Sequence, residues 1–538
     1  FLSKAAAKAN SGEGKYNPRC NFFLSICETG VLAYIRRMKK AVAPLWTFTL
    51  LFLAIMFLPR LVTQGMFGDG LLYASIARNL AEGKGMLWAP WFSTGYWIDF
   101  ASGAPYFENP PLMIWMQAGF FRLLGEGWWV EKLYSLFLFI LNAWLIVRVW
   151  EVPLRGTVFQ EKFGWFPLFF WYFIPSAIWG NPNNLMDNNL LTFCLLALWA
   201  GLDGVFSQQR LWLKMSLAGV FVYLGLMTKG PVALYPVAVP FLFVLTICSA
   251  TQSRRKNEWW RGIFQSLWIG IVAAGLFALM LVLILESRTY FENYWHQRLG
   301  VVLSGVREDA ALTGWARLSI FVILAKELAG VAAFLLGLFL VFQKRKITSE
   351  ESSRTRKTSQ LFLLLGFAGT LPLMLSARQS GMYIIPALPM FALAAGYFHL
   401  SVLHSWLSEP GEKTARFLRR LQVWSVAGMF VLAGYLIFLF GQPGRERALL
   451  HDLPYIQQAI PKGEKVGVCE KLMRDEHAHT YLQRFHHLEL TRDLSACRFA
   501  LTDRVCDEEM QEILLANGFE KVMKESSSEG SYFVYAKR

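Results

Sequence analysis

Long apolar stretches separated by short charged segments run through most of this 538-residue sequence. Eleven of them have about the 17 to 25 residues that a helix needs to cross a bilayer. They are residues 41–61, 131–150, 163–180, 187–205, 212–228, 231–249, 262–285, 317–343, 360–376, 382–405 and 420–441. The sequence therefore predicts an all-α polytopic membrane protein with about 11 to 13 transmembrane helices.

The composition and charge distribution support a membrane protein. Only 17% of the residues are charged and the mean hydropathy is +0.36, whereas soluble domains average about 25% charged residues. A net charge of +15 would suggest a nucleic-acid partner in a soluble protein. Here the basic residues cluster between apolar stretches, at Arg36-Arg37, Arg254-Arg255-Lys256, Lys344-Arg345-Lys346 and Arg419-Arg420. The positive-inside rule places such clusters in the cytoplasm, so we expect a cytoplasmic N-terminus and no nucleic acid.

The same rule divides the chain into regions. Residues 1–37 lack the apolar core and cleavage site of a signal peptide and are expected to be a poorly ordered extension. Residues 38–445 form the predicted transmembrane domain, with outer loops at 62–109 and 286–316. The apolar segment 110–124 is too short to cross, and a full crossing would move the later basic loops outside. It is therefore predicted to be a re-entrant or interfacial half-helix.

The last region, residues 446–538, has a different pattern and is predicted to be a small α/β domain on the outer side. Short apolar strands and amphipathic helices alternate in it. The strands are expected at 465–469, 499–501 and 532–535, and the helices at 474–485 and 508–516. Three cysteines allow one disulfide here, among Cys469, Cys497 and Cys506. Four histidines have a spacing that suits metal ligands, but a solvated surface is the simpler interpretation: His477, His479, His486 and His487.

Ionisable residues at the ends of apolar stretches carry the functional signal, because a charge at the membrane centre costs about 2.5 to 3.5 kcal/mol. The predicted topology places the following on the outer face: Asp69, Glu108, Asp187, Lys229, His296, Arg298 and Arg378. Taken singly, a Lys or Arg can snorkel, an Asp can form a turn or an N-cap, and a His can be interfacial. Together, carboxylates and cations at one face can bind a phosphate and transfer a proton at the lipid boundary.

Five motifs at these positions resemble, in order, those of the protein O-mannosyltransferase and aminoarabinose (lipid A) transferase superfamily. They are Asp69 to Arg78 with Tyr73, Tyr106-Phe107-Glu108-Asn109-Pro110-Pro111-Leu112, Met186-Asp187-Asn188-Asn189, Lys229-Gly230-Pro231, and Tyr383-Ile384-Ile385-Pro386. The resemblance covers about residues 40–440. It implies a GT-C glycosyltransferase that takes a sugar from a polyprenyl phosphate, undecaprenyl phosphate in bacteria. Transfer occurs with inversion, to a lipid, glycan or protein, at the periplasmic face of the inner membrane.

The resemblance also implies roles for single residues. Asp69 is the expected general base for an acceptor hydroxyl. Asp187 is expected to orient either Lys229 or the first outer loop, and Glu108 with His296 to position that loop. The expected contacts to the donor phosphate are Lys229, Arg298, Arg378 and Asn109. The expected substrate contacts are Tyr73, Tyr106 and Tyr383. In the aminoarabinose transferases a Glu and a His bind a metal ion, which allows a divalent cation at Glu108 and His296 here.

Two departures from the family pattern leave alternatives open. Gly70 replaces a second acidic residue, and Asn109 replaces the Lys that precedes Pro-Pro in aminoarabinose transferases. The loss of that cation keeps lipid, glycan and protein acceptors all open. An oligosaccharyltransferase-like enzyme and a transporter of lipid-linked sugars are the alternative functions. A transporter is disfavoured, because transporters place ionisable groups near the midplane and often have repeated halves. We expect a monomer.

Overall fold

The computed structural model describes most of the chain. The described residues are 41–94, 105–157, 159–160, 162–248, 255–300, 317–342, 349–375, 379–408, 411–522 and 532–537. The predicted extension 1–37 and the candidate residue Arg378 lie outside them.

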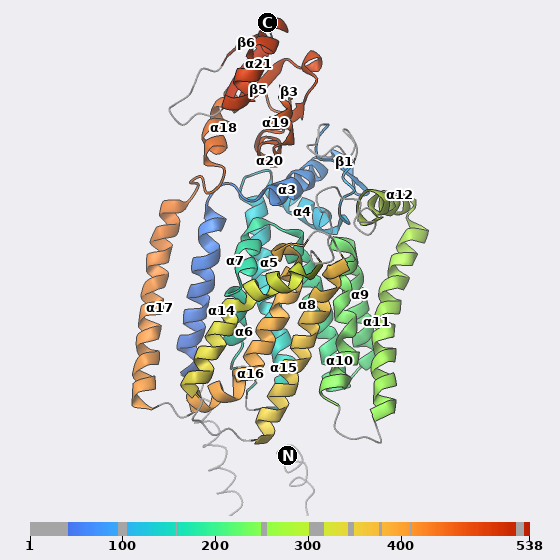
Figure 1. The fold of residues 1–538 in the computed structure, drawn as a ribbon, viewed down its shortest axis with the longest axis vertical. Helices are drawn as coiled ribbons and strands as arrows, with labels where there is room; N and C mark the ends of the chain where they lie inside the picture. The colour runs from blue at the N-terminus through green and yellow to red at the C-terminus, as the bar shows by residue number, and fades with distance from the viewer. Residues whose placement is uncertain are drawn as a thin grey trace, which may run out of the picture.

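A bundle of long helices carries the C-terminal domain on one end, which we call the capped end (Figure 1). After an unlabelled first helix at Ala41–Val62, the bundle helices are α5 (Val130–Glu151), α6 (Trp165–Tyr172), α7 (Pro175–Gly180), α8 (Met186–Ser207), α9 (Leu211–Lys229), α10 (Val239–Thr246), α11 (Arg255–Leu283), α14 (Ser319–Phe342), α15 (Ser349–Thr370), α16 (Leu388–Ser408) and α17 (Glu412–Leu439). Their shared core contains large buried aromatic side chains, among them Trp150, Trp171 and Tyr397.

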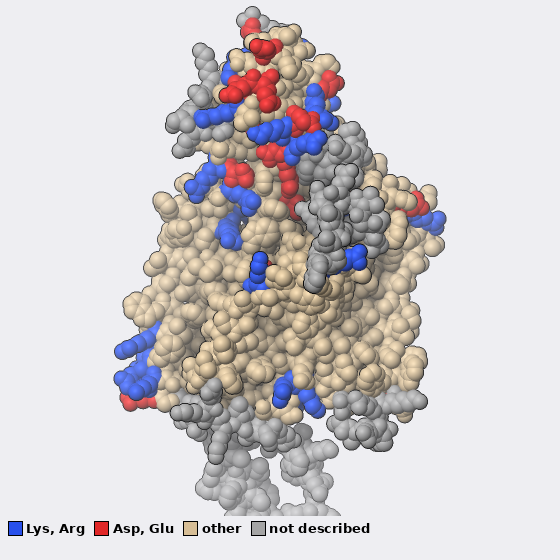
Figure 2. Space-filling view, viewed as in Figure 1, with Lys and Arg blue, Asp and Glu red and all other residues tan. Residues whose placement is uncertain are grey.

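Nine helices in the described part of the chain are long and apolar enough to cross a membrane. One of them, Leu211–Thr246, contains two predicted spans, which are α9 and α10 joined by the 3-10 helix η3 (Gly230–Ala238). The predicted span 163–180 is divided into α6 and α7, because Pro175 starts a new helix after the extended residue Ile174. Figure 2 shows a broad band with few charged side chains across the face of the bundle in view. These features confirm the predicted all-α polytopic architecture.

Shorter elements lie between the bundle and the C-terminal domain. The helices are α3 (Gly68–Ala81), α4 (Leu112–Leu124), α12 (Leu285–Tyr294) and the π-helix η4 (Trp295–Leu299), and two-residue strands β1 (Gly85–Met86) and β2 (Ala89–Pro90) form a hairpin. Helix α4 has 13 residues and packs on α3 at the capped end (Figure 1). That placement agrees with the predicted half-helix. The 3-10 turns η1 (Val152–Leu154), η2 (Asn181–Asn183), η6 (Leu371–Leu375) and η7 (Gly381–Ala387) connect bundle helices.

The C-terminal domain is the predicted α/β unit. Its sheet has the order β4-β3-β5-β7-β6, with β3 parallel to β4 and β5, and β7 antiparallel to β5 and β6. The strands are β3 (Lys465–Val468), β4 (Glu489–Thr491), β5 (Phe499–Asp503), β6 (Phe519–Lys521) and β7 (Tyr532–Lys537). The helices are α18 (Arg447–Ala459), α19 (Glu470–Arg474), α20 (Glu476–His486) and α21 (Arg504–Ala516), with the 3-10 turn η8 at Leu494–Ala496. A disulfide joins Cys469 to Cys506, one of the predicted pairings.

Two features tie this domain to the bundle and correct one expectation. Its hydrophobic core includes Met66 and Leu71, which belong to the first outer loop and α3. The expectation of a solvated histidine surface was wrong, because three of the four side chains are buried: His479, His486 and His487. Helix α20 lies beside α3, so the C-terminal domain contacts the segment that carries Asp69 (Figure 1).

Candidate active site

Helix α3 carries the first two candidate residues at its N-terminal end. Asp69 lies in the first turn and Tyr73 one turn later, a spacing that places both on one helix face. Asp69 is half-buried, and its carboxylate makes no hydrogen bond or ion pair within the part of the chain that the structure describes. It is therefore available to a ligand.

Gly70 allows α3 to start where it does. A Cβ atom on Gly70 would lie 2.2 Å from the carbonyl oxygen of Asn183, so no side chain fits there. Two amides fix the same contact: Asn184 Nδ2 donates to the Gly70 carbonyl at 2.8 Å, and the Phe67 N–H donates to Asn183 Oδ1 at 3.2 Å. A side chain at position 70 is thus excluded sterically, because α3 docks directly against η2.

Asp187 and Lys229 form a close pair between the start of α8 and the end of α9. Lys229 Nζ lies 2.5 Å from Asp187 Oδ2, and Asp187 is 2% exposed. The other carboxylate oxygen of Asp187 has no hydrogen-bond partner among the described residues. Lys229 Nζ also lies 5.1 Å from the ring centroid of Tyr383 on η7. Asp187 thus contacts Lys229 directly, as one of its two expected roles requires, and both roles stay predictions.

The loop before α4 places Glu108 and Asn109 opposite η4. Arg298 Nη1 lies 3.6 Å from Glu108 Oε2. Asn109 Nδ2 donates to the Tyr106 hydroxyl at 2.8 Å, so in this structure its amide orders the loop. The Tyr290 hydroxyl on α12 donates to the Asn109 carbonyl at 2.5 Å and fixes this loop to α12.

Electrostatics show that these segments form one group around Tyr73. Burial raises the pKa of Tyr73 well above its ordinary value, and nearby charges add to the effect: Asp69, Tyr106, Asp187 and Glu108. Burial opposes the charge of Arg298, but Glu108, Tyr106, Tyr383 and Tyr73 favour it, so its pKa is raised. A charge changes the pKa of another group appreciably only over short distances. The structure therefore brings together nine of the predicted residues: Asp69, Tyr73, Tyr106, Glu108, Asn109, Asp187, Lys229, Arg298 and Tyr383.

Two predicted residues do not join this group within the described chain. Arg378 lies outside the described residues, and His296 is exposed on η4. For a metal ion, the donor set here is limited to Glu108, which pairs with Arg298, and His296, and no described three-ligand group contains either. These residues do not fit a resident metal ion as they stand. Metal binding there stays a prediction.

The sequence did not reveal the residues that support the group. Tyr290 and Tyr294 are buried on α12, and Tyr294 Oη would lie 2.7 Å from a Cβ atom on Gly230, which has φ +73°. Gly230 therefore allows α9 to end against Tyr294 with Lys229 turned toward Asp187. The only available signal was the high number of aromatic residues around 290–295, which is also typical of a membrane interface.

Comparison with solved structures identifies the fold. The chain is similar to ArnT from Cupriavidus metallidurans bound to undecaprenyl phosphate, with 15% identity, a TM-score of 0.58 and coverage of 91% of this chain and 97% of that one. The apo state of the same protein matches over the same extents with a TM-score of 0.56. The archaeal oligosaccharyltransferase AglB from Archaeoglobus fulgidus matches at 12% identity and a TM-score of 0.45, over 93% of this chain and 74% of that one.

No protein-family model matches the chain, and no curated protein matches it in sequence. The fold is nevertheless defined by the similarity to ArnT over nearly the whole of both chains. The protein is a polytopic membrane protein with the GT-C fold. Its helical bundle matches the ArnT-like GT-C fold, and a small C-terminal strand-containing domain is present.

Proposed function

We propose that the protein is a membrane glycosyltransferase that moves a sugar from a polyprenyl phosphate to an acceptor hydroxyl at the capped face. One observation carries the proposal: three carboxylates and two cations from five separate segments converge there around Tyr73. The ArnT of the same fold binds undecaprenyl phosphate, which supports a donor of that class. Because Asn109 replaces the Lys of the aminoarabinose transferases, the acceptor can be a lipid, a glycan or a protein.

The proposed reaction is a single displacement. The acceptor hydroxyl gives its proton to Asp69 as its oxygen forms a bond to the anomeric carbon. The bond from that carbon to the phosphate oxygen breaks at the same time, and the electron pair leaves with the polyprenyl phosphate. Attack from the opposite side inverts the anomeric centre. Asp69 suits the base role because its carboxylate is half-buried and not engaged by the described chain.

Lys229 and Arg298 are proposed to stabilise the departing phosphate, where negative charge increases in the transition state. Each cation already faces one carboxylate, Asp187 or Glu108, and each is thereby held in place. The group around Tyr73 contains three described carboxylates, Asp69, Glu108 and Asp187, and two described cations, Lys229 and Arg298. A phosphate therefore needs a further positive charge. We assign that charge to Arg378, the remaining cation of the predicted set.

The orientation in the membrane follows from the two ends of the bundle. The described basic residues Arg419 and Arg420 lie in the first half of α17, which starts at the end opposite the C-terminal domain, and the positive-inside rule assigns a basic end to the cytoplasm. The Cys469–Cys506 disulfide lies on the capped side, and disulfides persist in oxidising compartments such as the periplasm. Both features support a periplasmic capped face in a bacterial inner membrane.

The proposal is tested with purified protein in detergent and a panel of radiolabelled undecaprenyl-phosphate sugars, with membrane extract as the acceptor. We expect release of free undecaprenyl phosphate from one donor or a few, above protein-free micelles. The donor that reacts identifies the sugar. Lack of release from every donor would contradict the proposal, and release of oligosaccharide from a diphosphate-linked donor would favour the oligosaccharyltransferase alternative.

A further inference from the structure

A basic pocket lies where the C-terminal domain meets the capped end, away from the candidate active site. It has a volume of about 600 Å³. Four cations line it: Arg78 of α3, Lys84 of the loop after α3, Arg122 of α4 and Lys462 of the C-terminal domain. Arg78 lies nine residues along α3 from Asp69, which is roughly 14 Å of helix, so the pocket is separate from the candidate active site.

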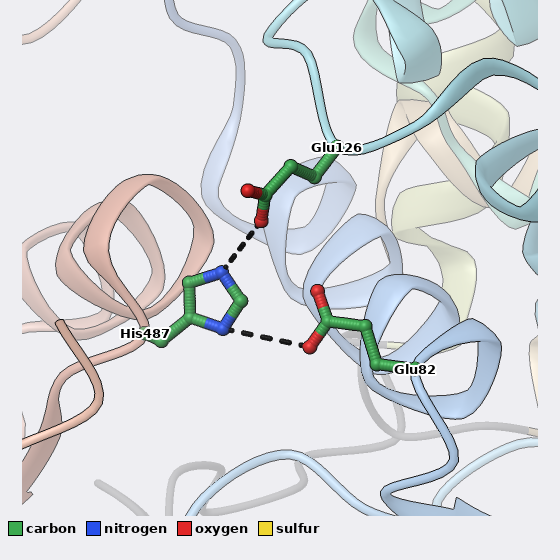
Figure 3. Close-up of side chains that lie close together, drawn as sticks. All are labelled: Glu82, Glu126 and His487. Atoms are coloured by element: carbon green, nitrogen blue, oxygen red, sulfur yellow. Dashed lines mark hydrogen bonds and ion pairs between the residues drawn. The ribbon is translucent and has the colours of Figure 1, made fainter.

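Two carboxylates also line the basic pocket, and both are already engaged. Figure 3 shows Glu82 and Glu126 turned toward opposite nitrogens of the His487 imidazole. His487 Nε2 lies 2.9 Å from Glu126 Oε2, and Nδ1 lies 3.6 Å from Glu82 Oε2. Lys462 Nζ donates to the two oxygens of Glu126 at 2.7 and 2.8 Å, and Arg78 Nε lies 3.6 Å from Glu82 Oε1. The two carboxylates therefore balance two of the four cations.

The other two cations give the basic pocket an excess of positive charge. Arg122 makes no hydrogen bond or ion pair within the described part of the chain. Lys84 is 52% exposed and lies 4.0 Å from a carboxylate oxygen of Glu82, which Arg78 already faces. Burial lowers the pKa of His487 to about 3, so the imidazole adds no charge at neutral pH. The pocket therefore suits an anion, and phosphate oxygens match both ammonium and guanidinium donors.

An exposed apolar edge adjoins the basic pocket. Leu123 and Leu124, which follow Arg122 at the end of α4, are 85% and 39% exposed. Just beyond them, the ring centroid of Trp128 lies 6.0 Å from that of Phe440, which directly follows the membrane helix α17. Aromatic and apolar side chains at the end of a membrane helix are typical of the lipid headgroup region. We therefore expect lipid phosphates at the level of Arg122.

We propose that the basic pocket binds the phosphodiester headgroup of an anionic phospholipid from the leaflet at the capped face. Arg122 and Lys84 bind the phosphate oxygens, and the acyl chains lie along Leu123 and Leu124. A headgroup that also contacts Lys462 joins the C-terminal domain to α4. A soluble phosphate shares the headgroup chemistry, but it has no apolar part to match the exposed leucines. The proposal does not depend on the transferase activity.

The experiment measures lipid binding to the full-length protein in a neutral detergent, by native mass spectrometry and by thermal unfolding. Phosphatidylglycerol, phosphatidylcholine with the same acyl chains, and inorganic phosphate are compared at equal concentration. We expect phosphatidylglycerol to bind most tightly and to raise the melting temperature, because it binds the folded protein. Equal effects of the two lipids would overturn the proposal. An equal effect of inorganic phosphate would also overturn it, since the ligand would then be a soluble anion.

Charge variants of the basic pocket should change the affinity in opposite directions. One cation near an anionic lipid contributes about a fivefold change in affinity. Arg122→Gln should therefore weaken phosphatidylglycerol binding about fivefold, and the further change Lys84→Gln should remove most of it. Both side chains are exposed, so we expect these variants to fold. Glu126→Gln should strengthen binding, because it removes an opposing charge and releases Lys462. Equal binding in all of these variants would overturn the proposal.

Two control variants separate the basic pocket from other sites for an anion. Arg447→Gln removes an exposed arginine at the start of α18, on the same capped side but outside the lining of the pocket. Asp187→Asn/Lys229→Met removes a cation of the candidate active site. Both variants should bind phosphatidylglycerol as wild type does. A loss of binding in the second would place the lipid in the active site, a loss in the first would indicate general surface charge, and either would overturn the proposal.

Discussion

The two ends of helix α3 are built differently. At its start, the Asp69 carboxylate is half-buried and contacts no donor among the described residues. Near its end, Arg78 is 1% exposed and donates to the carbonyls of Gln483 and Arg484 at 2.9 and 2.7 Å, and to the Gln483 side chain at 2.6 Å. One helix thus combines a carboxylate free to bind a ligand with a guanidinium fixed to another domain.

The contacts at the fixed end explain how Asp69, at the free end, can be held in a defined position. Arg484 of α20 also ties the C-terminal domain to the capped end. It donates to the carbonyls of Glu126 and Gly127 and pairs with Glu131 of α5 at 2.7 Å. Tyr481 contacts the residue two positions before α3, because its hydroxyl accepts from the N–H of Met66 and donates to the Met66 carbonyl. The C-terminal domain therefore contacts the chain just before α3, at Met66, and near the end of α3, at Arg78. Its role in the account is to position Asp69.

Loss of Lys229 should cause the largest fall in turnover. In Lys229→Ala we expect turnover to fall by about 10² to 10³, because a cation aimed at the departing phosphate is removed. Single-turnover release of the polyprenyl phosphate measures it. Asp187 would be left buried without its partner, so the double variant Asp187→Asn/Lys229→Met is the control. It should recover the melting temperature but not the rate; recovery of the rate as well would contradict this role.

Removing a contact at the fixed end should lower stability more than turnover. Arg484→Ala leaves Glu131 buried, at 1% exposure, without a partner, and losses of about 3 to 5 kcal/mol are typical of such changes. Thermal unfolding in detergent should show a markedly lower melting temperature, while Arg492→Ala, at 57% exposure, should leave it unchanged. A wild-type melting temperature for Arg484→Ala would show that the domain does not depend on this contact.

A smaller effect is expected where α3 docks on η2. Gly70→Ala should cost about 1 to 3 kcal/mol, because the added Cβ atom would press on the Asn183 carbonyl and shift the start of the helix. Turnover should fall with it, since Asp69 moves. Gly119→Ala on α4 is the matched control, because nothing lies within 4 Å of a Cβ atom there. Equal melting temperatures for the two variants would argue against the close approach.

Tyr73→Phe should have the smallest effect. The hydroxyl lies among three carboxylates but is proposed neither to accept the proton nor to bind the phosphate. We expect turnover within about tenfold of wild type, with the change divided between kcat and KM. A hundredfold loss in kcat would place Tyr73 in the chemistry itself.

The sequence predicted what depends on local pattern. Apolar length defined the membrane helices, and five short motifs indicated the residues that meet around Tyr73. Local pattern could not show that Pro175 divides one span into α6 and α7 or that β4 and β6, with three residues each, complete the sheet. It also missed the contact of Arg78 with the carbonyl of Gln483, because the two are 405 residues apart in sequence. His487 was assigned to a solvated surface for the same reason.

The most direct test of the account is the single-turnover rate of Asp69→Asn, measured together with its melting temperature. Asparagine conserves the size of the side chain and cannot accept the proton. We predict a rate lower by at least about 10², as for loss of a general base, and a melting temperature equal to that of wild type. A rate within a few-fold of wild type in the folded variant would contradict the assignment of Asp69 as the base.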